Sequence, residues 1–404
     1  MTTTSNQKLA TSHKQPATNN QPTTKMNLFN VYPLFNINPV KAQGSFLWDD
    51  QGEQYLDFYG GHAVISIGHN HPHYQSKLKE QLEKISFYSN SVQNELQTEL
   101  ADKLGKLSGY EEYNLFLCNS GAEANENALK LASFHNGKSK VLYFTGSFHG
   151  RTSAAVSVTD NPKIVAPVNF SERFIKSEWN DIQQLEEIFA AQGNNISSVI
   201  IEGIQGVGGI MIPTAEFLST IKELCEKYNA VLILDEVQSG YGRSGYFFAH
   251  QEFGLEADII TTAKGMGNGF PVGGVLIHPK FVASNGLLGT TFGGNHLACA
   301  ASIAVLDVMK DENLIENAQK MGEYIENEIK DLPHIKSIRR KGLMIGIELD
   351  RDCSEIRKSL LFDHHIFTGN SNDKTVLRIL PALNIKKEET DLFINALKTV
   401  LKGI

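Results

Sequence analysis

Short apolar segments alternate with longer segments of helical periodicity from about residue 26 onward. Segments rich in Val, Ile and Leu predict buried strands over 141–144, 199–201, 231–234, 259–261 and 275–277. Amphipathic patterns between them predict helices over 122–135, 181–191 and 214–228. Strands that alternate with helices in this way indicate an α/β fold, with a mostly parallel central sheet flanked by helices.

The pattern changes at about residue 289, where the chain becomes largely helical. Helical patterns over 297–310 and 313–330 precede strand-like segments at 343–349 and 376–380 and a final amphipathic helix over 387–402. This change predicts a smaller α+β domain over 289–404, after a large domain over 76–288.

The first 25 residues differ from the rest of the chain. They are rich in Thr, Ser, Asn and Gln and contain no aromatic or acidic residue. We expect a disordered tail over 1–25, because such a segment has too little apolar surface to bury. A targeting segment is the alternative, although transit peptides are Arg-rich and this segment has no Arg.

Charge and composition restrict the partners and the compartment. The 37 basic and 45 acidic residues give a net charge of −8. Without a basic cluster, this balance argues against nucleic acid and anionic membranes as partners. No segment approaches the ~18 apolar residues of a membrane-spanning helix. The four cysteines are scattered without CxxC spacing, so we expect a reducing, cytoplasmic location rather than a disulfide framework.

Candidate chemistry lies just after the strands, because parallel α/β sheets bind ligands beyond the carboxyl ends of their strands. Asp235, Glu236 and Gln238 follow the strand at 231–234. A carboxylate at this place fits a protonated pyridine nitrogen, which it would keep cationic as an electron sink. Gln238 could then bond the phenolic oxygen of the same ring. Taken alone, Asp235 also fits a helix cap or a salt bridge.

The strand at 259–261 leads to Lys264, which is followed by Gly265, Gly267 and Gly269. Glycines let a bulky planar group approach the backbone. A lysine that is desolvated beside a cationic cofactor has a lowered pKa and becomes a nucleophile, as Schiff-base chemistry requires. An isolated loop lysine is usually solvated, but after a buried strand Lys264 indicates a pyridoxal phosphate site.

Ser120, Gly121 and Ala122 open the helix predicted over 122–135. The free N–H groups and the dipole of a helix start form a phosphate cradle, which these small residues leave accessible. The same residues also fit a plain capping box, with Ser120 as the cap and Glu123 three residues later.

Two further groups of residues offer candidate chemistry. Phe148 and Arg151 follow the strand at 141–144 and offer a stacking face and a bidentate fork for a carboxylate. His69, His71 and His73 alternate in an irregular turn that contains Pro, and no Cys or carboxylate completes a ligand shell. We therefore expect no metal site.

As a set, these residues give the chain a resemblance to the class III (ω-amino acid) pyridoxal-phosphate aminotransferases, from residue 26 to the C-terminus. Within that class it is most similar to the acetylornithine/succinylornithine aminotransferases. The resemblance rests on Ser120-Gly121-Ala122-Glu123-Ala124-Asn125, Phe148-His149-Gly150-Arg151-Thr152, Leu234-Asp235-Glu236-Val237-Gln238, Lys264, Thr290-Thr291-Phe292-Gly293-Gly294-Asn295 and Leu377-Arg378.

The resemblance implies fold type I, an N-terminal segment (26–75) that joins the small domain, and a homodimer with shared active sites. Lys264 would be the Schiff-base lysine and proton carrier, and Asp235 would hold the pyridine nitrogen. The family pattern further implies ring stacking by Phe148, phosphate binding by Gly121, Ala122 and the partner's Thr291, and substrate contacts from Arg151, Tyr32, Arg378 and the partner's Thr290.

The implied reaction moves the δ-amino group of N-acetyl- or N-succinylornithine to 2-oxoglutarate, which gives a semialdehyde and glutamate. Alternatives are ornithine, 4-aminobutyrate or lysine as amino donor, an aminomutase on the same scaffold, and a non-catalytic protein that retains the fold. Two positions depart from the common family pattern and leave the donor open. Val207 replaces a usual Glu, and His62 stands where relatives carry a specificity residue.

Overall fold

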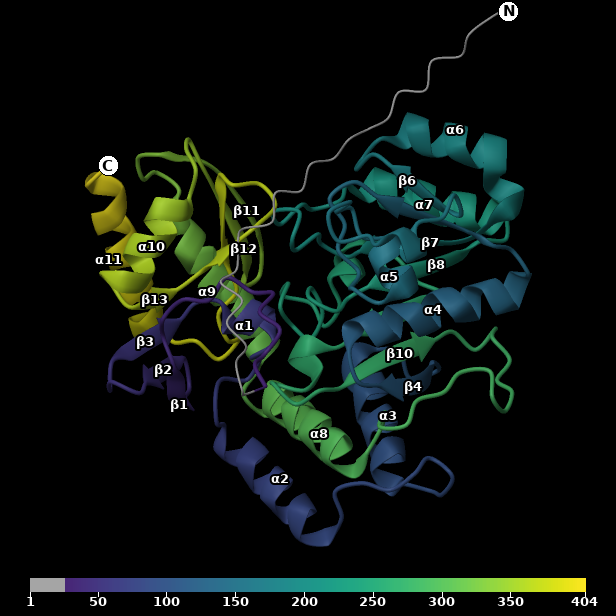
Figure 1. The fold of residues 1–404 in the computed structure, drawn as a ribbon, viewed down its shortest axis with the longest axis horizontal. Helices are drawn as coiled ribbons and strands as arrows, with labels where there is room; N and C mark the ends of the chain where they lie inside the picture. Colours follow the sequence, from purple (N-terminus) through teal and green to yellow (C-terminus); the bar gives the residue numbers. More distant parts are fainter. Residues whose placement is uncertain (1–25) are drawn as a thin grey trace, which may run out of the picture. The chain divides into compact units, whose positions relative to one another are not determined.

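The computed structural model describes residues 26–404, and the tail predicted for residues 1–25 lies outside the described residues (Figure 1). The chain divides into two compact units, Met1–Asn38 and Pro39–Ile404. The described part of the first unit, residues 26–38, contains no helix or strand. All the helices and strands below therefore belong to the second unit.

A seven-stranded sheet forms the centre of the second unit (Figure 1). Its strands lie in the order β4 (Asn114–Cys118), β10 (Gly273–Ile277), β9 (Ile259–Thr262), β8 (Val231–Asp235), β7 (Ile196–Glu202), β5 (Lys140–Phe144) and β6 (Phe174–Ser177). The strands from β9 to β6 are parallel, whereas β10 is antiparallel to both of its neighbours. The expected α/β fold with a mostly parallel sheet is thus confirmed.

The reversed direction of β10 has a local cause. The loop 263–272 joins β9 directly to β10, without the long crossover that parallel neighbours need. The sequence predicts a buried strand over 275–277. Its apolar residues do not indicate in which direction the strand runs.

Side chains of β8 alternate between the two faces of the sheet. Val231 and Ile233 pack in one cluster with residues of α4 (Gly121–Asn136), and Leu232 and Leu234 pack in another with residues of α7 (Ala215–Lys227). Helices therefore cover both faces, and strands buried on both faces consist of continuous apolar residues. This is why the central strands could be recognised in the sequence.

The remaining helices of this part are α2 (Pro72–Lys84), α3 (Glu95–Ser108), α5 (Ser153–Ser157), α6 (Ile182–Gln192) and α8 (His296–Asp311). Helix α8 packs against α2 and α3. Short 3₁₀ turns lie at Pro167–Asn169, Gly193–Asn195, Ala249–Phe253 and Lys264–Met266. A further turn, α1 (Gly60–Ala63), has left-handed backbone angles.

Two smaller sheets complete the second unit. One is antiparallel and has the order β11 (Ile335–Lys341), β12 (Met344–Leu349), β15 (Val376–Ile379) and β14 (Gly369–Asn370). The other has the order β1 (Pro39–Gln43), β2 (Phe46–Asp49), β3 (Gln54–Asp57) and β13 (Ile366–Phe367). The helices of this part of the chain are α9 (Leu314–Ile329), α10 (Ser354–Phe362) and α11 (Lys387–Lys402).

The pairing of β3 with β13 joins the N-terminal and C-terminal parts of the second unit. Pro39–Ile404 is nevertheless one compact unit by its contacts. The division into 26–75, 76–288 and 289–404 therefore stays a prediction.

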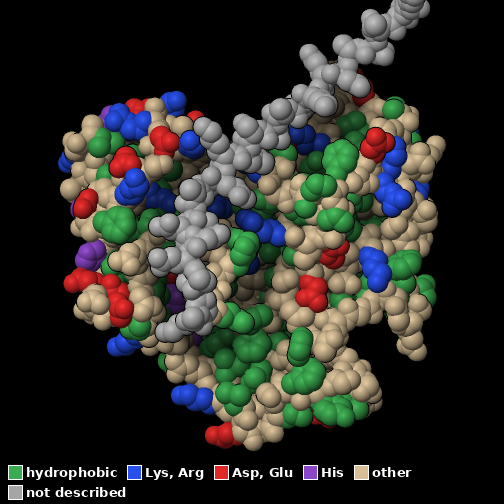
Figure 2. Space-filling model, viewed as in Figure 1, with side chains coloured by type: hydrophobic (Ala, Val, Ile, Leu, Met, Phe, Trp, Pro, Cys, Tyr) green, Lys and Arg blue, Asp and Glu red, His purple; other side chains and the backbone are tan. Residues whose placement is uncertain are grey.

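The surface carries charged side chains of both signs (Figure 2). Lys and Arg side chains are mixed with Asp and Glu on the face that Figure 2 displays. Over residues 26–404, no helix has both the length and the apolar character needed to cross a membrane. All four cysteines, Cys118, Cys225, Cys299 and Cys353, are buried free thiols.

Candidate active site

A cavity of about 300 Å³ lies where the carboxyl ends of β5, β8 and β9 meet the first turn of α4. This placement follows from the parallel sheet, whose strand ends lie on one edge. Its lining includes seven of the predicted site residues: Ser120, Gly121, Ala122, Phe148, Asp235, Gln238 and Lys264. Segments separated by more than a hundred residues of sequence thus contribute to one site.

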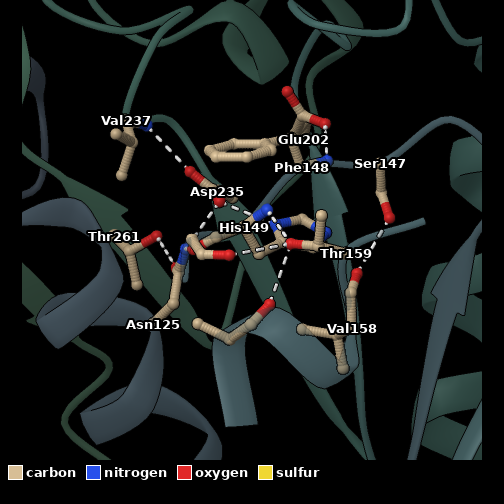
Figure 3. A network of polar contacts seen from close by, with 12 residues as sticks. Asn125, Ser147, Phe148, His149, Val158, Thr159, Glu202, Asp235, Val237 and Thr261 are labelled. Atoms are coloured by element: carbon tan, nitrogen blue, oxygen red, sulfur yellow. Dashed lines mark hydrogen bonds and ion pairs between the residues drawn. The ribbon is translucent and has the colours of Figure 1, made fainter. Parts of the chain in front are cut away.

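Asp235 is held in a buried network at the wall of this cavity (Figure 3). Its Oδ2 accepts a hydrogen bond from Asn125 Nδ2 at 2.7 Å and lies 2.7 Å from His149 Nδ1. Its Oδ1 accepts from the backbone N–H of Val237 at 3.0 Å. Thr261 fixes Asn125 in turn, because its hydroxyl donates to Asn125 Oδ1 at 2.7 Å. The carboxylate therefore has one orientation.

Glu202, at the end of β7, lies near the same network (Figure 3). Its Oε1 accepts from the backbone N–H of Phe148 at 2.9 Å, and its Oε2 accepts from that of Gly206 at 3.0 Å. These bonds fix the backbone that carries the Phe148 ring. Burial raises the pKa of Glu202 to about 7, and the nearby Asp235 adds to the rise, whereas His149 opposes it.

Lys264 lies on the cavity wall in a strained backbone conformation. Its φ is 42°, in the left-handed region that side-chain-bearing residues rarely adopt. Ser66 supports the turn, because its hydroxyl donates to the carbonyl of Gly265 at 2.8 Å, and the hydroxyl of Tyr74 donates to that of Gly267 at 2.8 Å. Backbone strain is common at functional sites, where surrounding contacts hold it.

The Lys264 amine makes no hydrogen bond or ion pair with any residue from 26 to 404. Burial lowers its pKa below the ordinary value, and Arg378 adds to this effect. Asp235 and Glu202 oppose it. An amine with a lowered pKa and no partner can act as a nucleophile or carry a proton.

The first turn of α4 forms a cradle for an anion. Ser120 caps the helix, because its hydroxyl accepts from the backbone N–H of Glu123 at 3.2 Å. Ser120 therefore caps the helix, as its place in the sequence allowed. The N–H groups of Gly121 and Ala122 remain without an acceptor in the described chain. A Cβ at position 121 would lie 2.6 Å from a methyl carbon of Val237, so only Gly fits.

Gln238 lines the cavity, but its amide is engaged with the protein. Its Nε2 donates to the carbonyl of His62 at 3.2 Å, and its Oε1 accepts from Arg378 Nη1 at 3.4 Å. Arg378, on β15, is 3% exposed and lies outside the residues that line the cavity. Its guanidinium also donates to the hydroxyl of Tyr59 at 2.8 Å and to the carbonyl of Asn370.

Besides Arg378, three predicted residues of the second unit do not line the cavity. Arg151 is exposed and does not line it. The Thr290 hydroxyl donates to Glu123 at 3.1 Å and accepts from Asn119 at 3.1 Å, and Thr291 is exposed. Tyr32 belongs to the first unit, where it is also exposed. Their roles toward substrate and phosphate stay predictions.

The three histidines near residue 70 bind three separate carboxylates. His69 pairs with Asp57 at 2.9 Å, His71 with Glu312 at 2.8 Å and His73 with Asp307 at 3.1 Å. Each ring therefore has its own structural partner. In the part of the chain that the structure describes, no cluster of His, Cys, Asp and Glu could hold a metal ion.

Glu236 points away from the cavity into a second buried network. Its Oε1 lies 2.7 Å from His250 Nδ1, and its Oε2 accepts from the hydroxyl of Ser239 at 2.5 Å. The Tyr110 hydroxyl lies 2.6 Å from the other nitrogen of His250. These contacts give Glu236 a structural role next to Asp235.

Sequence reasoning assigned no role to Asn125, His149, Glu202 or Tyr59. Asn125 follows Gly121 by one helical turn, and this spacing could have indicated a side chain facing the same site. His149 and Glu202 each stand just after or at the end of a strand, where the other candidates were found. Tyr59 offered no such signal.

Comparison with known proteins identifies the family. Residues 30–401 match the family described as "Aminotransferase class-III". The chain is a class III aminotransferase. Enzymes of this class use pyridoxal phosphate, so the amine of Lys264, the carboxylate of Asp235 and the cradle of α4 can be compared with a defined cofactor.

Curated relatives cover nearly the whole aminotransferase. The acetylornithine aminotransferase of Archaeoglobus fulgidus is 38% identical over 376 residues, which are 91% of this chain and 96% of the relative. That of Bacillus subtilis is 39% identical over 384 residues, which are 93% and 97% of the two chains. Among solved structures, the ornithine aminotransferase of Toxoplasma gondii has a TM-score of 0.85 at 29% identity, with 92% and 91% of the two chains covered.

The cavity of this aminotransferase fits pyridoxal phosphate in three respects. The α4 cradle offers unpaired N–H groups to a phosphate, since Gly121 leaves room for close approach. Asp235 has a fixed carboxylate that could meet a ring nitrogen, and Phe148 lines the same cavity with an aromatic ring. Lys264 provides an unpaired amine for the cofactor's carbonyl carbon.

Proposed function

We propose that this aminotransferase transfers the δ-amino group of N-acetyl- or N-succinylornithine to 2-oxoglutarate, a step of arginine biosynthesis. The donor becomes an N-acylglutamate semialdehyde, and 2-oxoglutarate becomes glutamate. The observation that carries the proposal is the placement of the Lys264 amine and the Asp235 carboxylate on one cavity. The acyl-ornithine is supported by the relatives named acetylornithine aminotransferase, at 36–39% identity over most of the chain.

Each residue has a defined task in this reaction. Pyridoxal phosphate, when bound, supplies a conjugated ring that accepts the electrons of the bond broken at the amine-bearing carbon. Asp235 would hold the ring nitrogen and maintain its positive charge. Lys264 would hold the cofactor through its amine and would carry a proton within the cavity, which its lowered pKa favours.

The substrate contacts are assigned from charge and position. Arg378 is the cation for a substrate carboxylate, since it is buried and its hydrogen-bond acceptors are neutral: Tyr59, Gln238 and the Asn370 carbonyl. Arg151 and Tyr32 are assigned to the acyl-ornithine. Both side chains are exposed, so a substrate could reach them.

We further propose a homodimer with shared active sites in the cytoplasm. Exposed apolar side chains, Phe87, Tyr88, Val92 and Phe292, lie in segments 82–92 and 282–292, and the rings of Phe87 and Phe292 are 5.5 Å apart. Thr290 and Thr291 belong to the second segment, so pairing through this surface would present them to a partner. The four free thiols fit a reducing compartment.

A panel of ω-amino donors with 2-oxoglutarate tests the proposal. N-acetylornithine, N-succinylornithine, ornithine, 4-aminobutyrate and lysine are each supplied to the holoenzyme, and glutamate formation is measured. The highest kcat/KM is expected for an N-acylated ornithine. Ornithine is the second candidate, because solved ornithine aminotransferases share the fold at a TM-score of 0.85. Migration of the amine without glutamate formation would indicate an aminomutase. No reaction with any donor would indicate a non-catalytic protein.

A further inference from the structure

Four residues form a closed ring of hydrogen bonds beside the cavity. Arg378 Nη2 donates to the hydroxyl of Tyr59 at 2.8 Å, and that hydroxyl lies 2.7 Å from His62 Nδ1. Gln238 closes the ring, because its Nε2 donates to the His62 carbonyl and its Oε1 accepts from Arg378 Nη1. The Arg378 guanidinium also lies over the Tyr59 ring, 5.6 Å from its centroid. Tyr59 therefore holds the guanidinium by two contacts.

His62 reaches this ring because of an unusual backbone turn. Gly60, Gly61, His62 and Ala63 all have positive φ, of 56°, 55°, 69° and 64°. Consecutive left-handed residues are rare, since a Cβ crowds the following carbonyl oxygen. Asp57 holds the turn, because its Oδ1 accepts from the N–H groups of Tyr59 at 3.1 Å and Gly60 at 2.8 Å. The strain is thus supported from β3 and has the effect of placing His62 against Tyr59.

The direction of the hydrogen bonds fixes the state of the His62 ring. Arg378 can only donate, so the Tyr59 oxygen accepts from it and must direct its own hydrogen elsewhere. His62 Nδ1 lies 2.7 Å away and can accept this hydrogen, an arrangement in which Nδ1 carries no proton. Burial and the positive charges of Arg378, Lys264 and Arg357 lower the pKa of His62, so the neutral ring is favoured near pH 7.

We propose that neutral His62, acting through Tyr59, is a positioning residue that orients Arg378 toward a substrate carboxylate. The proposal rests on the proposed function, in which Arg378 binds the carboxylate. The acceptors in this ring are uncharged, so they orient the guanidinium without neutralising it. An arriving carboxylate can replace the longest contact, to Gln238 Oε1 at 3.4 Å, while Tyr59 keeps the guanidinium in place.

Binding of glutarate to the holoenzyme tests this role. Glutarate carries two carboxylates but no amino or oxo group, so titration calorimetry measures binding without reaction. Tyr59→Phe keeps the ring under the guanidinium and removes only the hydroxyl, and we expect glutarate affinity to fall about tenfold. His62→Ala, which removes the acceptor, should have a similar effect. His62→Asn keeps an oxygen near the Nδ1 position and tolerates positive φ, and it should restore most of the affinity.

The pH dependence separates positioning from packing. Protonation of His62 removes the acceptor for Tyr59, and the lowered pKa of His62 puts this change below pH 6.5, so wild-type affinity should fall there more steeply than that of His62→Asn. Protonation of glutarate itself affects both enzymes equally, so it cancels in the difference between their pH profiles. Parallel profiles, or affinities of Tyr59→Phe and His62→Ala within twofold of wild type, would overturn the proposal.

Arg378→Ala separates a failure of the positioning role from a failure of the proposed function. If it abolishes glutarate binding while the Tyr59 and His62 variants bind normally, the positioning role fails and the proposed function stands. If Arg378→Ala also binds glutarate normally, the assignment of Arg378 to the carboxylate is itself wrong. Thermal melting of each variant shows whether it is folded, and Tyr59→Phe is the variant least expected to disturb the backbone.

Discussion

His149 Nδ1 lies 2.7 Å from Asp235 Oδ2, and neither side chain is more than 3% exposed. The imidazole therefore fixes the carboxylate at the wall of the cavity, which both residues line. Together with Asn125 and the Val237 N–H, it leaves the carboxylate a single direction in which to meet a ligand. Preorganised groups of this kind lower a reaction barrier because they need not reorient as charge develops.

Removal of the Asp235 charge should therefore lower turnover strongly. Asp235→Asn retains the shape of the side chain but presents no negative charge to the cofactor ring. We expect kcat to fall on the order of 10²–10³-fold, the scale found for the loss of one preorganised electrostatic group. His149→Asn, which can still donate to Asp235, should lose less activity than His149→Leu. Steady-state kinetics on wild type, Asp235→Asn, His149→Asn and His149→Leu measures these losses of activity.

Lys264→Ala should abolish turnover and leave the protein folded. The amine is the nucleophile and proton carrier, whereas the cradle of α4 and Asp235 bind the cofactor without it. Alanine retains a Cβ, so the backbone strain at φ 42° is unchanged. Multiple turnovers measured with 2-oxoglutarate would refute this role. Lys163→Ala, an exposed lysine in a loop, is the matched control and should be fully active.

The cradle should depend on the contact between Gly121 and Val237. A Cβ at position 121 would come 2.6 Å from Val237 Cγ1, so Gly121→Ala should weaken pyridoxal phosphate binding by at least about tenfold. The double variant Gly121→Ala/Val237→Ala should recover part of the affinity, because it removes the clash. Equilibrium binding of the cofactor measures both. Gly403→Ala, where the nearest atom is 3.6 Å away, is the control.

Glu202 should make stability dependent on pH. Burial raises its pKa from 4.5 to about 7, so between these values the folded protein holds a proton that the unfolded chain has lost. This stabilisation is complete below pH 4.5 and is lost as the pH rises through 7. Relative to Glu202→Gln, the free energy of unfolding of wild type should fall on the order of 2 kcal/mol from pH 5 to pH 8.

Urea unfolding of the cofactor-free protein at several pH values measures this difference. Glu186→Gln, on the exposed side of α6, should show a difference from wild type that does not change with pH. A pH-independent difference for Glu202→Gln as well would mean that the buried carboxyl titrates normally.

Val207→Glu should shift the balance between the two half-reactions. Val207 and Arg378 both contact the segment 370–372, since the Asn372 N–H donates to the Val207 carbonyl at 2.9 Å and Arg378 donates to the Asn370 carbonyl. An acid at position 207 would compete with substrate carboxylates for Arg378. We expect the substitution to slow the reaction of glutamate more than that of the ω-amine donor, by about 1–3 kcal/mol in activation free energy. Single-turnover rates with each donor, measured for wild type and Val207→Glu, test this prediction. Equal effects on both donors would mean that Val207 has only a packing role.

The sequence predicted those parts of the molecule in which one local pattern determines the outcome. The strand ending at Leu234 is apolar on both faces, so it could be found and Asp235 could be placed just beyond it. Ser120 caps a helix in any context, and this sufficed to place the cradle. Lys264 was indicated by its position after a buried strand.

The substrate side could not be predicted in this way. Tyr59 and Arg378 are separated by 319 residues, and no periodicity links them. The left-handed turn at Gly60–Ala63 is signalled by two glycines, but His62 and Ala63 give no sign that they share it. Arg378 itself lies in an apolar strand, where only the family resemblance distinguished it from an ordinary buried arginine. Such contacts depend on how distant segments pack.

Asp235 and Glu236 are adjacent in the chain but belong to different networks, one with His149 and one with His250. Because strand side chains alternate, a codon lost within β8 would move Glu236 into the place of Asp235, and a codon gained would move Asp235 into the place of Glu236. In the first case Glu236 would face the cofactor cavity, and in the second Asp235 would face His250. The two networks therefore tolerate a changed side chain elsewhere in β8 better than a change in the length of the strand.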